Sequence, residues 1–531
     1  MFTESRQQIV KAEETTDLSS LRSRAPEHLP QRSVHDAANL SAKDAMTVRR
    51  TLVGPLCILV LCFASAAVFA ADPPAKADRA TMMPTAISVP PAAQPSAHFD
   101  PEAATNAYLA LIPPSAKAGS DAYFEGGYWL LLWDFLYGAV IAFLILNLRW
   151  SAAMRNLAER ITRFGPVRTA LYWTQYIVLA SVLGFPLTVY EGYFREHQYG
   201  LATQTFGPWM LDQVKGLLVS LILGAIITAL LFGVVRKLPR TWWIWGALVT
   251  LAFLVFVSLI GPVYITPIFN KVTRLQDPVV TQPILKLARA NGIPTNDVYE
   301  VDASKQSKRM SANVSGFGNT MRITLNDNLL HRGSPEEIQA VMGHEMGHYV
   351  LNHVYKMIVE FLVLIVVWFA LLQWSLEWSL ARWGEKWQIR GVGDTAVLPL
   401  VLLVSSLFFF VLTPVLNTMI RTREAEADMY GLNASRQPDG FAQAAIHLAE
   451  YRKMSPGPVE EWIFFDHPSG RNRILRAMRW KGANLELFDG KENPPDNKAA
   501  GQRPRASDPT RPVSIRGPRP EARGLVHQHQ G

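Results

Sequence analysis

Six apolar segments long enough to cross a lipid bilayer limit what this chain can fold into. They cover roughly residues 127–148, 168–190, 214–236, 241–263, 354–374 and 396–419. About 20 apolar helical residues span the hydrocarbon core of a membrane, where helices also satisfy the backbone polar groups. The 531 residues are 49% hydrophobic and only 18% charged. These features predict an α-helical polytopic membrane protein.

The positive charges lie in loops beside these segments. A net charge of +8 could indicate a nucleic-acid partner, but residues 149–168 hold five arginines, and Arg236, Lys237 and Arg240 crowd the loop that follows the third segment. Such short basic loops normally stay in the cytoplasm. We therefore expect no nucleic-acid partner. We expect a bacterial-type inner membrane, with residues 265–352 on the outer, periplasmic face.

The ends of the chain have a different composition. We expect residues 1–45 to be a non-native or disordered extension, 46–70 a signal peptide or first transmembrane helix, and 71–124 a linker rich in Pro and Ala. The tail at 489–531 has a disorder-prone composition. Both cysteines lie in the 46–70 run, so the rest of the chain has no thiolate for a metal.

The sequence His-Glu-Met-Gly-His at 344–348 follows a helix start signal. Ser334 is a candidate N-cap, Pro335 occupies the first helical position, and Glu337 completes a capping box. Helical residues four apart differ by about 40° of rotation, so the two histidines can share one metal ion. Glu345 can then act as a base toward water. The alternative is that the two histidines are polar surface residues without a metal.

A second acidic run at 423–428 also reads as a helix. Glu424 and Asp428 share one face, whereas Glu426 lies roughly 200° around from Glu424. One helix can therefore direct either the first pair or Glu426 toward the histidines, but not both. A solvated face with Arg and Glu pairs is the alternative.

Several ordered motifs resemble the type I CAAX prenyl proteases, which are integral-membrane zinc metalloendopeptidases. The resemblance runs over roughly residues 125–480. Its motifs are HEMGH at 344–348, Arg-Glu-x-x-Ala-Asp at 423–428, His-Gln-Tyr-Gly-Leu at 197–201, Pro-Ile-Phe-Asn-Lys at 267–271, and Asp-His-Pro at 466–468 followed by Arg473. This ordered set is far more specific than HExxH alone.

The resemblance implies a fold and a set of site residues. The fold would have six to seven transmembrane helices forming a chambered barrel, and a mainly α zinc-metalloprotease domain with a small β-sheet. One Zn²⁺ per chain would be held by His344, His348 and Glu424, with Asp428 supporting these ligands. His467 would stabilise the oxyanion and Arg473 would orient nearby carboxylates.

The resemblance also divides the chain and suggests where substrate binds. Residues 125–264 would form a four-helix membrane domain, 265–352 and 420–488 the catalytic parts, and 353–419 two further spans. The family strand that contacts substrate usually reads Asn-Ala-Tyr, whereas this chain has Asn313-Val314-Ser315. Asn313 is therefore a candidate for substrate binding, and a turn residue is the alternative.

Taken together, these observations predict zinc-assisted peptide hydrolysis with Glu345 as the catalytic base. The substrates would be peptides or proteins, prenylated or not, that are met in or at the lipid bilayer. One alternative is a general quality-control protease for membrane proteins without prenyl specificity. Another is a non-catalytic membrane scaffold with a structural zinc site, although such sites normally have four protein ligands. An intramembrane zinc protease and a transporter are further alternatives.

Overall fold

The computed structural model describes residues 86–316 and 321–488. Within them, six helices are long and apolar enough to cross a membrane, as predicted. They are α3 (Pro114–Asn147), α5 (Gly165–Val189), α7 (Phe206–Lys237), α8 (Trp242–Ile260), α13 (His353–Trp387) and α14 (Leu398–Ser435). Large apolar side chains such as Trp129, Phe143 and Ile222 are exposed on them, as contact with lipid requires.

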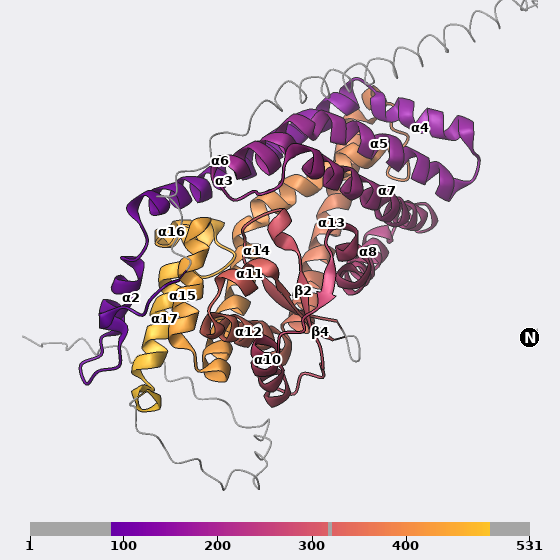
Figure 1. Ribbon diagram of the computed structural model, residues 1–531. Helices are drawn as coiled ribbons and strands as arrows, with labels where there is room; N and C mark the ends of the chain where they lie inside the picture. The colour runs from indigo at the N-terminus through magenta and orange to yellow at the C-terminus, as the bar shows by residue number, and fades with distance from the viewer. Residues whose placement is uncertain (1–85, 317–320, 489–531) are drawn as a thin grey trace, which may run out of the picture.

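Shorter elements connect and extend these spans. A π-helical turn, η3 (Tyr190–Arg195), continues α5 into α6 (Glu196–Gln198), and another, η4 (Gly261–Ile265), continues α8 into α9 (Thr266–Phe269). The helix α4 (Trp150–Ile161) lies between α3 and α5 in the chain. Figure 1 shows α4, α5 and α7 at the end of the molecule away from α12, α15 and α17.

A small mixed sheet forms the centre of the polar domain between α8 and α13. Its strands are β1 (Val272–Arg274), β2 (Val298–Val301), β3 (Ala312–Ser315) and β4 (Arg322–Asn326), in the order β1-β2-β4-β3. Only β2 and β4 pair in parallel. Ile323 and Leu325 of β4 are fully buried in one cluster with Met342 and Met346. The sheet therefore packs directly on the helix that carries the HEMGH motif.

Further helices complete the polar region. They are α10 (Pro278–Ala290), α11 (Asp327–Arg332), α12 (Pro335–Val350), α15 (Pro438–His447), α16 (Pro458–Phe464) and α17 (Gly470–Gly482). Within the part of the chain that the structure describes, strand β3 pairs only with β4 and is an edge strand.

The structure corrects the prediction that residues 71–124 form a linker, because the described part of this range contains helices. Residues Pro101–Leu109 form α2, which begins at an Asp100 cap and packs beside α17 (Figure 1). The Tyr108 hydroxyl, fully buried, donates to Asp439 at 2.8 Å. Proline misled the prediction because Pro101 and Pro114 each occupy the first position of a helix, where no backbone N–H is needed.

Three predictions for the chain ends concern residues that the structure does not describe. They are the extension at 1–45, the signal peptide or first span at 46–70, and the tail at 489–531. They stay predictions.

The acidic residues inside two spans have partners in the protein. Glu360 of α13 forms an ion pair with Arg423 of α14. Asp134 of α3 lies within hydrogen-bonding contact of Glu191 in η3. Both acidic groups therefore contact other polar side chains of the protein, as expected for polar groups at membrane depth.

Glycines allow α12 and α14 to approach until their backbones touch. A Cβ atom at Gly431 of α14 would lie 2.7 Å from the backbone nitrogen of His344, and one at Gly343 would lie 2.9 Å from the Gly431 carbonyl oxygen. A Cβ at Gly347 would lie 3.2 Å from Ala427. Any larger residue would push the two helices apart, because core packing has no spare room.

We expect Gly431→Ala to destabilise the protein by about 1–3 kcal/mol, since the added methyl group overpacks this contact. Thermal unfolding in detergent measures the loss. The matched control is Gly138→Ala in α3, where a Cβ meets nothing within 4 Å. The control should unfold like the wild type. Equal unfolding temperatures for Gly431→Ala and the wild type would contradict the packing argument.

Candidate active site

The helix α12 begins as the capping box predicts and presents both histidines. The Ser334 hydroxyl accepts from the Glu337 backbone nitrogen at 3.2 Å, and the Glu337 carboxylate accepts from the Ser334 nitrogen at 2.6 Å. The two imidazoles lie one turn apart, with 3.2 Å between their Nε2 atoms. His344 is buried and His348 is partly exposed.

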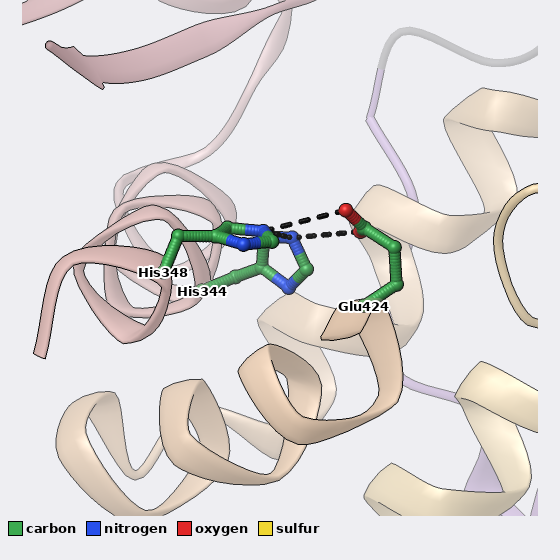
Figure 2. Close-up of side chains that lie close together, drawn as sticks. All are labelled: His344, His348 and Glu424. Carbon is green, nitrogen blue, oxygen red and sulfur yellow. Dashed lines mark hydrogen bonds and ion pairs between the residues drawn. The ribbon is translucent and has the colours of Figure 1, made fainter. Parts of the chain in front are cut away.

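Glu424 reaches these histidines from α14. Its carboxylate oxygens lie 3.2 Å from His344 Nε2 and 3.4 Å from His348 Nε2. Figure 2 shows the three side chains pointing toward one common point from two facing helices. Of the two arrangements that the sequence left open, the structure shows Glu424 and Asp428 facing His344.

The three side chains fit a divalent metal ion. A tetrahedral ion with ligand bonds of about 2.0–2.1 Å holds its ligand atoms about 3.3 Å apart. The measured separations of 3.2 to 3.4 Å match this value. In addition, the buried Glu424 Oε2 lies 3.2 Å from the Nε2 atoms of both His344 and His467. A cation bound there would take this oxygen as a ligand, and water or substrate would complete the set of four ligands.

The charges around the histidines also suit a cation. Burial lowers the pKa of His344, but hydrogen bonds to Asp428 and Glu424 outweigh it and raise the pKa to about 9. The site therefore favours positive charge at this imidazole. Burial and the neighbouring His344 lower the pKa of His348 to about 4, so its nitrogen lone pair is available at neutral pH.

Asp428 supports His344 from behind. Its carboxylate lies 2.9 Å from His344 Nδ1 and accepts hydrogen bonds from Arg473 at 2.6 Å and Arg476 at 2.7 Å. The Asp428 side chain is completely buried, so these contacts replace water. A proton held on Nδ1 by Asp428 leaves Nε2 as the ligand atom.

A pocket of about 220 Å³ opens beside these groups. The residues that line it include Ser311 and Ala312 of the edge-strand region, and Glu345, His467 and Arg473. Burial raises the pKa of Glu345 to about 7, against the opposing effect of His344. A carboxylate with this pKa can both accept and release a proton near neutral pH.

His467 and Arg473 both lie beside the carboxylates of α14. His467 Nε2 is 3.2 Å from Glu424 Oε2, and its Nδ1 is 2.8 Å from the Asp466 carboxylate. Arg473 bonds to Asp428, and its guanidinium also lies 3.5 Å from His344 Nδ1. Arg473 thus contacts a carboxylate that in turn contacts His344.

Asn313 is not brought to the histidines. It lies on β3, opposite Thr324 of β4, and its exposed side chain lines a separate cleft that also includes Pro262. The adjoining residues Ser311 and Ala312 line this cleft too, and they also border the pocket at the metal ligands. Asn313 itself does not line that pocket.

The motif analysis missed His353, which supports the second histidine. His353 is 1% exposed; its Nδ1 lies 3.0 Å from His348 Nδ1, and its Nε2 lies 3.0 Å from Glu426. When His348 Nε2 binds a metal, its Nδ1–H can donate to His353, whose Nε2–H donates to Glu426. The histidine five residues after His348 was the available signal. His353 is also a hydrogen-bonding partner of Glu426, a residue to which the motif analysis assigned no role.

We expect His353→Phe to lower metal affinity by about 10- to 100-fold, because the ring remains but the hydrogen bond to His348 is lost. Competitive metal titration measures the change. The control Glu426→Gln keeps an acceptor for His353, so its loss should be smaller. Wild-type affinity in His353→Phe would show that His353 only fills space.

Comparisons with known proteins cover most of the described chain. A family model for the CAAX prenyl protease N-terminal region, five membrane helices, matches residues 109–271, and the model for peptidase family M48 matches residues 274–481. The uncharacterized metalloprotease YhfN of Bacillus subtilis is 27% identical over 375 residues, covering 70% of this chain and 88% of that protein.

Named prenyl proteases match over shorter stretches. CAAX prenyl protease 1 of Saccharomyces cerevisiae is 32% identical over 170 residues, which are 32% of this chain and 37% of the relative. The Arabidopsis thaliana homolog is 34% identical over 173 residues, or 32% of this chain and 40% of the relative. The alignments thus span less than half of these relatives.

A solved structure shares the fold. The crystal structure of S. mikatae Ste24p matches with a TM-score of 0.54 at 20% sequence identity, covering 80% of this chain and 98% of that chain. The two family models together run from residue 109 to residue 481, through both the HEMGH helix and Glu424. The chain therefore belongs to the type I CAAX prenyl protease family, whose members are M48 metallopeptidases of the membrane.

Proposed function

We propose that this chain is a zinc-dependent endopeptidase, with one Zn²⁺ held by His344, His348 and Glu424. The observation that supports this proposal most directly is that one ligand atom from each of these residues lies within 4.8 Å of the other two. The donor set supports zinc because two imidazoles and one carboxylate, with a fourth position open, are typical of catalytic zinc sites. When bound, the ion supplies Lewis acidity, which activates water and polarises a peptide carbonyl.

The neighbouring side chains then have separate roles. Glu345 accepts a proton from the attacking water and delivers it to the leaving amine, which its place in the pocket and its raised pKa both support. His467 stabilises the negative charge that develops on the carbonyl oxygen. Arg473 and Asp428 act as positioning residues, because they contact each other and His344.

The edge of the sheet offers a place for an extended substrate. β3 has one unpaired edge, so its backbone can hydrogen-bond a peptide that runs past the pocket. Ser311 and Ala312 border both this edge and the metal ligands. We assign the substrate contact to this backbone, with Asn313 at most a side-chain contact at the far end of the bound peptide.

The orientation of the protein in the membrane determines which substrates can reach the metal site. The protein is an integral membrane protein, and we propose that it lies in a bacterial-type inner membrane with the metal site on the periplasmic side. The cluster of basic loop residues at the far ends of α5 and α7 supports this orientation. A periplasmic site would not meet cytosolic prenylated proteins. Turnover of membrane proteins or exported peptides, without a prenyl requirement, therefore fits better than CAAX processing.

A non-catalytic scaffold with a structural zinc ion is the second candidate function. The observation that favours it is His467, whose Nε2 lies 3.2 Å from Glu424 and close enough to complete a closed ligand set. Glu345, lining the pocket beside the ligands, disfavours it, because a structural site has no use for a base.

We expect Glu345→Gln to retain one zinc ion per chain but to lose at least about 100-fold in kcat/KM, since the amide cannot accept the proton. The assay is cleavage of a peptide panel, with and without a farnesylated cysteine, by purified protein. Unmodified peptides should be cleaved as readily as farnesylated ones.

The matched control is Glu336→Gln, an exposed carboxylate on the same helix, which should cleave like the wild type. A strong preference for farnesylated peptides would support CAAX processing instead. Zinc binding without cleavage of any peptide, by wild type and variant alike, would favour the scaffold.

A further inference from the structure

A basic cleft lies at the opposite end of the membrane helices from the metal ligands. It has a volume of about 400 Å³. The residues that line it come from α4, α5, α7 and the segment between α13 and α14, and they include Glu159, Arg168, Arg236, Arg390, Asp394 and Thr395. Figure 1 shows α4, α5 and α7 gathered at this end.

Two of the three arginines of the cleft lie near one carboxylate, that of Glu159. Arg390 binds Glu159 with two hydrogen bonds of 2.8 and 3.0 Å, while Arg168 comes only within 3.9 Å of the same group. Arg236 donates to the Gly393 carbonyl oxygen at 3.0 Å and has no ion pair among the described residues. The cleft therefore carries unbalanced positive charge.

The other carboxylate in the cleft does not offset this charge. Asp394 is almost completely buried and forms an ion pair with Arg155. It also accepts a hydrogen bond from the Arg390 backbone nitrogen at 2.9 Å. Guanidinium groups bind phosphate with paired, charge-assisted hydrogen bonds. An anion with several oxygens, such as a phosphate group, would satisfy the donors that Glu159 leaves free.

The position of the cleft along the membrane helices favours a lipid as the source of such a phosphate group. The helix α13 starts at His353, beside the metal ligand His348, and ends at Trp387 close to the cleft. Its 35 residues span about 50 Å, more than the roughly 30 Å hydrocarbon core. Exposed Ile161 ends α4 and exposed Phe164 precedes α5, the two helices that supply Glu159 and Arg168 to the cleft. A cleft at this end of the spans would lie near the lipid headgroups of the membrane face opposite the metal site.

We propose that this cleft binds the phosphate group of an anionic membrane lipid. Basic pockets between membrane helices on the cytoplasmic side suit such headgroups. The bound phosphate would link the ends of α4, α5 and α7 to the loop that precedes α14, the helix that carries Glu424. Lipid binding would therefore stabilise the helix bundle without taking part in the chemistry.

The test is thermal unfolding of the full-length detergent-purified protein, titrated with phosphatidylglycerol, with phosphatidylcholine or with inorganic phosphate. Phosphatidylglycerol should raise the unfolding temperature, and the other two should not. Arg168→Gln should weaken the phosphatidylglycerol effect by about fivefold in apparent affinity. The control Arg163→Gln lies at the same end, outside the cleft lining, and should behave like the wild type.

A second variant separates lipid binding from simple misfolding. Glu159→Gln removes the carboxylate that competes for Arg168 and Arg390, so phosphatidylglycerol should bind more tightly to it than to the wild type. Equal effects of phosphatidylglycerol and phosphatidylcholine, or no change in either variant, would overturn the proposal. Equal protection by inorganic phosphate would overturn the assignment to a lipid.

Discussion

The contact between α12 and α14 determines where the ligand atoms lie. The two helices approach until Gly431 meets the backbone of His344, a distance that only glycine permits at these positions. This approach places Glu424 against both histidines although the two motifs are separated by two membrane spans in the sequence. The metal site therefore depends on backbone packing as much as on its ligands.

Buried charges around the ligands reinforce this arrangement. Asp428 has no exposed surface, yet two arginines and His344 contact it. Removing the Asp428 carboxylate would leave the guanidinium groups of Arg473 and Arg476 without this partner in the protein interior, which is costly. On the other side, His353 links His348 to Glu426. Each histidine thus has its own carboxylate support, direct for His344 and through a second imidazole for His348.

Much of this architecture could be predicted from the sequence because its signals are local. Long apolar runs predicted six spans, and the capping box around Ser334 predicted where α12 begins. The spacing of Glu424 and Asp428 limited which carboxylates could reach the histidines together. Helical periodicity does not tell which distant helices touch each other. The contact between α12 and α14 was therefore needed to choose between Glu426 and the pair Glu424 and Asp428.

Other features could not be predicted for the same reason. The helix α2 was missed because its Pro and Ala content resembles a linker, and its burial depends on α17 far along the chain. His353 lies outside the HExxH motif, and its role depends on Glu426 from another helix. The place of Asn313 on a separate cleft follows from strand pairing, which the sequence of β3 alone does not reveal.

The measurement that tests the central claim most directly is an anomalous diffraction map of the crystallised protein, recorded at the zinc absorption edge. One peak should lie about 2.0–2.2 Å from the Nε2 atoms of His344 and His348 and from the Glu424 carboxylate, with one coordination position free of protein. A peak elsewhere would contradict the account. A fourth protein ligand such as His467 on the ion would do so as well, because it would close the site.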